Sequence, residues 1–148
     1  MNPVDIIKED HRRMEELFAK FLETDSEVTQ ETLFEQIETG LNAHSEMEER
    51  VLYPALRQYA PEKVDEAIDE HSEVKDLLLD LLESDLDEDA FESQFNRLVE
   101  DVRHHVEEEE SPNGLLALAQ QHFNAEQLSA MARDLLEVKR EVEEDLAA

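Results

Sequence analysis

The sequence contains no cysteine and only two glycines and four prolines among its 148 residues. Without cysteine, the chain cannot form a disulfide, a thiolate zinc site, an iron–sulfur cluster or a covalent haem attachment. Any metal site must therefore use histidine and carboxylate ligands. Few glycines and prolines, many glutamate and leucine residues and few β-branched runs favour helices over strands.

Basic residues are also scarce. Thirteen Lys and Arg residues stand against 41 Asp and Glu residues, which gives a formal net charge of −28. Nucleic acids and anionic membranes bind basic surfaces, so we expect neither as a partner, and the sequence leaves a protein partner open. A long apolar run and a signal-peptide pattern are absent as well, so we expect a cytoplasmic protein.

The spacing of the apolar residues predicts four long amphipathic helices joined by short links. The first spans about residues 3–23, the second ends near Tyr59, the third spans about 61–82, and the fourth follows an acidic turn at 84–89. A kink is expected at Pro54. A short apolar segment and a last helix capped by Asn124 follow. The predicted fold is all-α, an up-down-up-down antiparallel four-helix bundle with an additional C-terminal helix.

The chain contains an internal duplication. When the second half is laid on the first, His71 falls on His11. When the offset between the two halves is increased by one residue, His105 falls on His44 and Glu109 falls on Glu48. We therefore interpret residues 1–148 as one domain. It comprises two helical-hairpin repeats, at about 3–59 and 61–110, and a C-terminal helical segment at 115–146.

The duplicated polar residues lie on the apolar faces of their helices, which predicts a metal site. Histidine and glutamate at positions i and i+4 lie one helical turn apart and can reach one ion. A buried glutamate needs a partner, because desolvating its charge alone is costly. The predicted ligands are His11, His44, Glu48, His71, His105 and Glu109. Shared between two metals, they leave room for an oxo or hydroxo bridge and an open position, and they suit Fe, with Mn or Zn possible.

Other polar and aromatic candidates are interpreted as structural or solvent-exposed. Helical periodicity selects His105 and places His104 on the polar face. The rest of the acidic run is interpreted as a solvated face, the two tyrosines as packing residues, and the last histidine as structural or exposed. These residues are Glu107, Glu108, Glu110, Tyr53, Tyr59 and His122.

The ordered motifs resemble the haemerythrin-like, or HHE cation-binding, family over about residues 3–140. They are His11, His44-Ser45-Glu46-Met47-Glu48-Glu49 with Tyr53-Pro54, Glu70-His71, and His104 to Glu110. The resemblance implies a four-helix bundle with a non-haem di-iron centre that binds oxygen or related small ligands, held by the six residues named above. Oxygen-carrying haemerythrins have a further histidine where this chain has Lys75, which disfavours simple reversible oxygen carriage.

These observations lead to three functional hypotheses. The first is a di-iron protein that binds or senses O2, peroxide, nitric oxide or iron. The second is a di-iron enzyme that reduces peroxide or nitric oxide. The third is a structural bundle with zinc or no metal. A ferritin-type centre is disfavoured, because it needs two Glu-x-x-His motifs and only Asp101-Val102-Arg103-His104 approaches that spacing.

Overall fold

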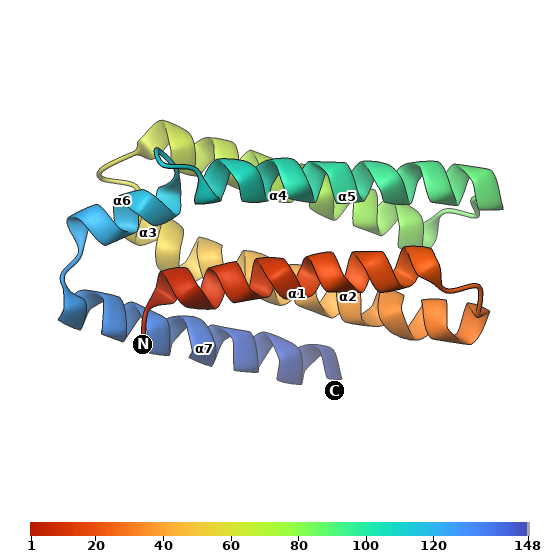
Figure 1. Cartoon of the computed structure of the whole chain (residues 1–148), viewed down its shortest axis with the longest axis horizontal. Coiled ribbons are helices and arrows are strands. Elements are labelled where there is room, and N and C mark those ends of the chain that lie inside the picture. The colour runs from red at the N-terminus through yellow and green to blue at the C-terminus, as the bar shows by residue number, and fades with distance from the viewer. Residues whose placement is uncertain (148) are drawn as a thin grey trace.

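The computed structural model describes residues 1–147, and within that range it consists of helices and short connections. The helical elements are α1 (Pro3–Glu23), α2 (Glu27–Met47), the π-helical turn η1 (Glu48–Leu52), α3 (Tyr53–Leu56), α4 (Pro61–Glu83), α5 (Glu88–Glu110), α6 (Leu115–His122) and α7 (Ala125–Ala147). Figure 1 shows α1, α2, α4 and α5 as a bundle, with α7 along the outside of α1 and α2. The predicted all-α fold, a four-helix bundle with an additional C-terminal helix, is confirmed.

Short polar side chains cap the starts of four helices. Each accepts a hydrogen bond from a backbone N–H of the first turn, which the helix itself leaves unpaired. Proline occupies the start of α1 and of α4, where its missing N–H costs nothing. The capping residues are Asn2, Ser26, Asp87 and Asn124, so both the acidic turn and the asparagine predicted as caps act as such.

The kink expected at Pro54 takes the form of the π-turn η1 directly before it. In this turn the N–H of Tyr53 donates to the carbonyl of Glu48, at position i−5. A π-turn holds one residue more than an α-turn, so it shifts the helix face by one position. Glu48 and Tyr53 therefore lie on the same side, and the helix continues as α3 to Leu56.

The apolar core has two parts. One, the closed end, lies under α6 and α7 and consists of Val4, Ile7, Met47, Leu52, Tyr53, Leu56, Val64, Ala67, Leu115, Leu116, Ala119, Met131, Leu135 and Val138. The other, the hollow end, contains Met14, Phe18, Phe21, Leu33, Ile37, Leu41, Val74, Leu77, Leu78, Leu81, Phe95, Leu98, Val99 and Val102. Along α1, His11 separates Ile7 of the first part from Met14 of the second, so a polar layer divides the core.

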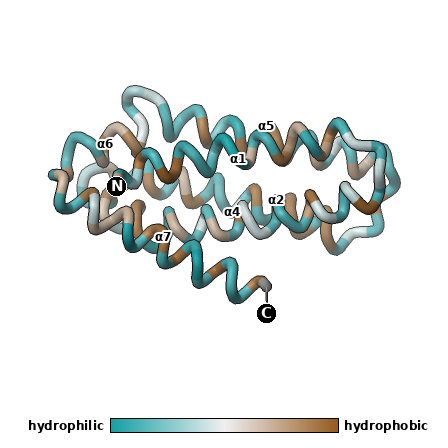
Figure 2. Tube along the Cα trace, turned by 60° about the horizontal axis from the view of Figure 1, so that its bottom comes forward, coloured by the Kyte–Doolittle hydropathy of each residue, from teal (hydrophilic) through white to brown (hydrophobic). Residues whose placement is uncertain are grey.

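The C-terminal helix α7 extends the closed end. It packs against α1, α2 and η1, and it buries Met131, Leu135 and Val138 against them. Figure 2 shows polar and apolar residues alternating along α7, as expected for a helix with one buried face. Among the helices of residues 1–147, none combines the length and apolar character needed to cross a membrane.

Candidate metal centre

The six side chains selected from the sequence converge in the polar layer between the closed end and the hollow end. Five are buried and His44 is half-buried. Their potential ligand atoms form two groups, each within 4.8 Å, and Glu48 belongs to both. The first group is His11, His44, Glu48 and Glu109, and the second is Glu48, His71 and His105.

The four imidazoles form two pairs, and each carboxylate reaches both pairs. The Nε2 atoms of His11 and His44 are 3.2 Å apart, and those of His71 and His105 are also 3.2 Å apart. Glu48 Oε1 lies 3.0 Å from Nε2 of His44 and 3.1 Å from Nε2 of His71. Glu109 lies 3.3 Å from Nε2 of His11 through Oε1 and 3.2 Å from Nε2 of His105 through Oε2. Both glutamates are therefore placed to bridge two cations.

The other ring nitrogen, Nδ1, of each histidine faces an outer carboxylate. The pairs are His11 with Glu110 at 2.8 Å, His44 with Asp10 at 3.3 Å, His71 with Glu49 at 2.9 Å, and His105 with Glu70 at 2.8 Å. A ring that donates its Nδ1–H in this way keeps the lone pair of Nε2 directed toward the centre. Metal-binding histidines are oriented by the same arrangement.

The outer carboxylates follow the duplication. Asp10 and Glu70 directly precede the aligned His11 and His71, and each pairs with the second histidine of its own hairpin. Glu49 and Glu110 directly follow Glu48 and Glu109, and each pairs with the first histidine of the other hairpin. The alignment of the two halves could therefore have identified this outer set.

Glu110, interpreted as part of a solvated face, is exposed but also contacts the centre. Its side chain is 32% exposed, but Oε2 accepts a hydrogen bond from His11 Nδ1. Periodicity assigns Glu110 to a polar face of α5, and α1 lies close enough to that face for the long side chain to reach His11. Glu107 and Glu108 are exposed, as expected.

Tyr53, interpreted as a packing residue, also reaches the centre. Its hydroxyl donates to Glu109 Oε2 at 2.7 Å and lies 3.3 Å from Nε2 of His71. Tyr53 does pack in the core, and the π-turn explains why the sequence did not predict this further contact. Regular helical spacing from His44 and Glu48 would direct residue 53 elsewhere. Burial, together with the charges of Glu48 and Glu109, raises the pKa of Tyr53 well above its ordinary value, so the hydroxyl keeps its proton.

The centre has the charge distribution of a cation site. Two buried carboxylate oxygens, Glu48 Oε2 and Glu109 Oε1, make no hydrogen bond within the described residues. They share the site with four nitrogen lone pairs at the distances given above. A buried anion needs compensation, and imidazole with carboxylate suits Fe, Mn or Zn. The donor set therefore fits the metal ions that the sequence predicts.

Protonation of the histidines would compensate the same charge if no cation were bound. Burial alone would lower the pKa of His44, but the charge of Glu48 and the hydrogen bonds with Asp10 and Glu48 raise it to about 10. The pKa values of His71 and His105 are raised against the effect of burial as well, by the carboxylates around them. Burial would raise the pKa of Glu48, but the histidines and Glu109 hold it well below its ordinary range.

The remaining candidates lie outside the centre. His104, on the polar face of α5, is 64% exposed and contacts Glu108 of the same helix and Glu70 of α4. His122 is exposed and stacks on Tyr59 with ring centroids 3.8 Å apart. Lys75, one turn after His71, is exposed. The structure thus separates His105 from its neighbour as the helical periodicity predicts.

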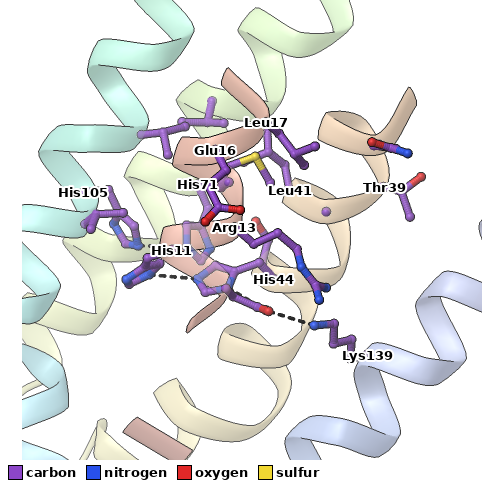
Figure 3. A pocket seen from close by; sticks show the side chains of 18 of the residues that line it. His11, Arg13, Glu16, Leu17, Thr39, Leu41, His44, His71, His105 and Lys139 are labelled. Carbon is purple, nitrogen blue, oxygen red and sulfur yellow. Dashed lines mark hydrogen bonds and ion pairs between the residues drawn. The ribbon is translucent and has the colours of Figure 1, made fainter. Parts of the chain in front are cut away.

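A cavity of about 630 Å³ adjoins the centre on the side of the hollow end. All four central histidines contribute to its lining, together with apolar residues of α1, α2, α4 and α5. Figure 3 shows His11, His44, His71 and His105 at one side of this space and Lys139 of α7 near its edge. A small molecule that enters the cavity can reach the centre.

The chain is similar to a curated protein and to a solved structure. The chain is 31% identical over 147 residues to a protein of Nostoc sp. named DNA nickase, and it spans 41% of the length of that relative. It has the fold of a crystal structure of a hemerythrin HHE cation binding domain-containing protein from Mycobacterium kansasii. The TM-score is 0.83 and the identity 24%, over 98% of this chain and 89% of that one.

The family model of the hemerythrin HHE cation binding domain matches residues 2–116. The matched span includes both hairpins and all six residues of the centre. The fold agrees with that match, and so does the cluster of buried His and Glu side chains that could hold a metal ion. The chain belongs to the hemerythrin HHE cation-binding domain family.

Proposed function

We propose that the chain holds two iron ions between its two hairpins and uses them to bind or sense O2, peroxide or nitric oxide. The observation that carries this proposal is the convergence of four Nε2 atoms on two buried carboxylates, with an oxygen of each carboxylate left without a hydrogen bond among the described residues. Protein interiors rarely leave such groups uncompensated. The family match supports a cation in this place.

In this proposal each hairpin supplies the histidine pair for one ion and one bridging glutamate. His11 and His44 would hold one ion, His71 and His105 the other, and Glu48 and Glu109 would bind both. Four donors per ion leave a coordination position for a small ligand. Bound iron would supply a Lewis-acidic and redox-active site. Manganese and zinc also suit these donors.

The surrounding residues orient this ligand set and hold protons in place. The four outer carboxylates accept the Nδ1–H groups, which fixes each ring with Nε2 toward the centre. The hydroxyl of Tyr53 keeps its proton and donates a hydrogen bond to Glu109 Oε2, with 2.7 Å between the two oxygens. Leu52 and Leu56 beside Tyr53 are completely buried, so apolar side chains cover the centre there. In this proposal a ligand enters from the larger cavity, to which all four histidines contribute.

Metal analysis and absorption spectra together test the proposal. We expect the protein purified without added metal to contain iron, about two ions per chain. We expect its spectrum to change between nitrogen, air, peroxide and nitric oxide. Glu109→Ala should lose the iron, and the matched control Glu107→Ala, in the same acidic run but exposed, should keep it. Zinc or no metal in the purified protein would instead support the structural-bundle hypothesis.

The cavity favours one alternative, a di-iron enzyme that reduces peroxide or nitric oxide, because it gives a substrate access to the open positions. Turnover of peroxide by the iron-loaded protein, abolished in Glu48→Ala, would support the enzyme. A ligand-dependent spectrum without turnover would support binding or sensing.

Nicking of DNA is a property given to the Nostoc relative, of which this chain spans only 41%. We do not extend it to this chain, because a net charge of −28 repels a polyanion. Gel-shift assays should show no binding of duplex DNA. A cytoplasmic location, expected from the sequence, stays a prediction.

A further inference from the structure

The cavity beside the centre is larger than the ligands discussed so far require. Its volume is about 630 Å³, whereas one water molecule occupies about 30 Å³ in the liquid. Sites for small organic molecules span roughly 300–1,000 Å³. The volume therefore matches an organic molecule better than a diatomic gas.

Apolar side chains form the walls of this space. They come from four helices and are Met14, Leu17, Leu41, Val74, Val102 and Val106. Four of them keep 7–9% of their surface exposed, although they belong to the core. Deeper in the same part of the core, Phe18, Ile37 and Leu98 keep 0%. The side chains of the wall thus leave space beside the histidines that an apolar guest could fill.

The rim of the cavity has an unusual charge balance for this protein. Three basic residues (Arg13, Lys20 and Lys139) and three acidic residues (Asp10, Glu16 and Glu35) line it, whereas the whole chain has 13 basic and 41 acidic residues. Lys139 is already paired with Asp10, at 2.8 Å. An anion is therefore repelled less at this rim than on the rest of the surface.

Two basic side chains of the rim are free to bind an anionic group. Arg13 and Lys20 are exposed, and within the described side chains neither makes an ion pair shorter than 4.0 Å. They are two helical turns apart on α1, so they project from the same side, about 10 Å from one another along the axis. Leu17 lies between them on that side and belongs to the apolar wall. Cationic and apolar surfaces thus meet at the entrance.

We propose that this cavity binds a small anionic amphiphile, of the class of medium-chain carboxylates. The carboxylate would pair with Arg13 and Lys20 at the rim. The apolar body would lie between the walls, with its far end toward the four histidines. This ligand class goes beyond the proposed binding of small gases and peroxide, and the site does not require a metal in the centre.

Isothermal titration of the full chain with octanoate tests the proposal. We expect saturable binding of one octanoate per chain, weaker binding of butyrate, and no binding of octyltrimethylammonium. The last comparison is sharp, because the overall charge of −28 favours the cation, and only pairing with Arg13 and Lys20 at the rim favours the anion. The titration is repeated on metal-loaded and metal-depleted protein, and we expect similar affinity.

Paired variants assign the binding to the cavity. Arg13→Gln combined with Lys20→Gln should weaken octanoate at least about tenfold, because each removes a charged partner. Arg12→Gln is the control, since Arg12 is exposed on α1 and does not line the cavity. Leu17→Trp should abolish binding by filling the space, and Leu22→Trp, at an exposed position of the same helix, should not.

Several results would overturn the proposal. They are no saturable binding of octanoate, equal affinity in the Arg13 and Lys20 double variant, equal binding of the cationic amphiphile, or binding that disappears when the metal is removed. Circular dichroism checks that each variant folds. If Leu17→Trp unfolds, the exposed charge variants still decide. Iron content and ligand-dependent spectra are separate readouts, so failure here is distinguishable from failure of the proposed di-iron function.

Discussion

The hairpin of α1 to α3 and the hairpin of α4 and α5 each contribute two histidines, one glutamate and two outer carboxylates to the centre, but they are supported differently. In the first hairpin, Asp10 accepts a hydrogen bond from Lys139 of α7. Its counterpart Glu70 in the second hairpin lies beside the exposed His104. The duplication thus repeats the potential ligands, whereas Lys139 of the additional helix contacts an outer carboxylate of the first hairpin.

The two hairpins differ most where the second helix of each passes the bridging glutamate. In the first, the π-turn continues the helix and brings Tyr53 to the centre. In the second, the chain turns away, and Gly114 occupies the position that the duplication aligns with Tyr53. A Cβ at Gly114 would lie 2.5 Å from the carbonyl oxygen of Glu109, so no larger residue fits this backbone. The two halves of the centre are therefore chemically unequal, although their donors match.

The largest expected effect comes from the imidazole pairs themselves. His105→Ala should lower the metal content sharply, because it removes a ligand that also contacts both bridging glutamates. His104→Ala, its exposed neighbour, should leave the content unchanged. Elemental analysis of the purified variants measures both. Equal loss in the two variants would contradict the assignment of the α5 face.

Removal of the metal should lower the melting temperature by roughly 10 °C or more, because the ions would bind only the folded chain. The metal-free protein should also respond to pH. The pKa of His44 is raised to about 10 in the folded state, from an ordinary value of 6.5. Protonated His44 therefore stabilises the folded state fully below pH 6.5, and this stabilisation is lost as the pH rises toward 10. Thermal unfolding with and without chelator, at several pH values, checks both expectations.

The metal-loaded protein is the control for this pH response, since a bound cation replaces the protons. Its melting temperature should not fall over the same range, because metal competes better as protons become scarce. A metal-free transition that is independent of pH between 6.5 and 10 would show that the histidines do not take up the compensating protons.

Tyr53→Phe tests the contact that the first hairpin alone provides. The change removes the hydroxyl that donates to Glu109 and should cost about 1–3 kcal/mol of unfolding free energy, because a buried acceptor loses its donor. Tyr59→Phe is the control and should change stability by less than about 0.5 kcal/mol, as Tyr59 is partly exposed. Urea unfolding of both variants gives the comparison. Similar costs would mean that the hydroxyl of Tyr53 is not specific to the centre.

The smallest expected effect concerns the support that α7 gives to Asp10. Lys139→Met should weaken metal binding by less than about tenfold, because Lys139 acts on His44 only through Asp10. Arg140→Met, at an exposed neighbouring position, should have no effect. Competition with a chelator of known affinity measures the difference. An effect as large as that of His105→Ala would mean that α7 positions the whole centre.

Helical periodicity explains how much of this centre could be predicted. The helical repeat is a local property, so the sequence predicted the inward faces of the four helices and, with them, His11, His44, Glu48, His71, His105 and Glu109. It could not predict Tyr53, because a π-turn changes the spacing at that point. The sequence also did not predict the contact between Glu110 and His11, because these residues are 99 positions apart in the chain.

The sequence by itself determined the helices, their buried faces and the duplicated set of donors, because each depends on residues within a few turns of one another. Only the tertiary structure decided which carboxylate faces the Nδ1 atom of each histidine, where α7 contacts the centre, and that a cavity adjoins the four histidines. Those features depend on distances between helices, and side chains far apart in the chain set these distances together.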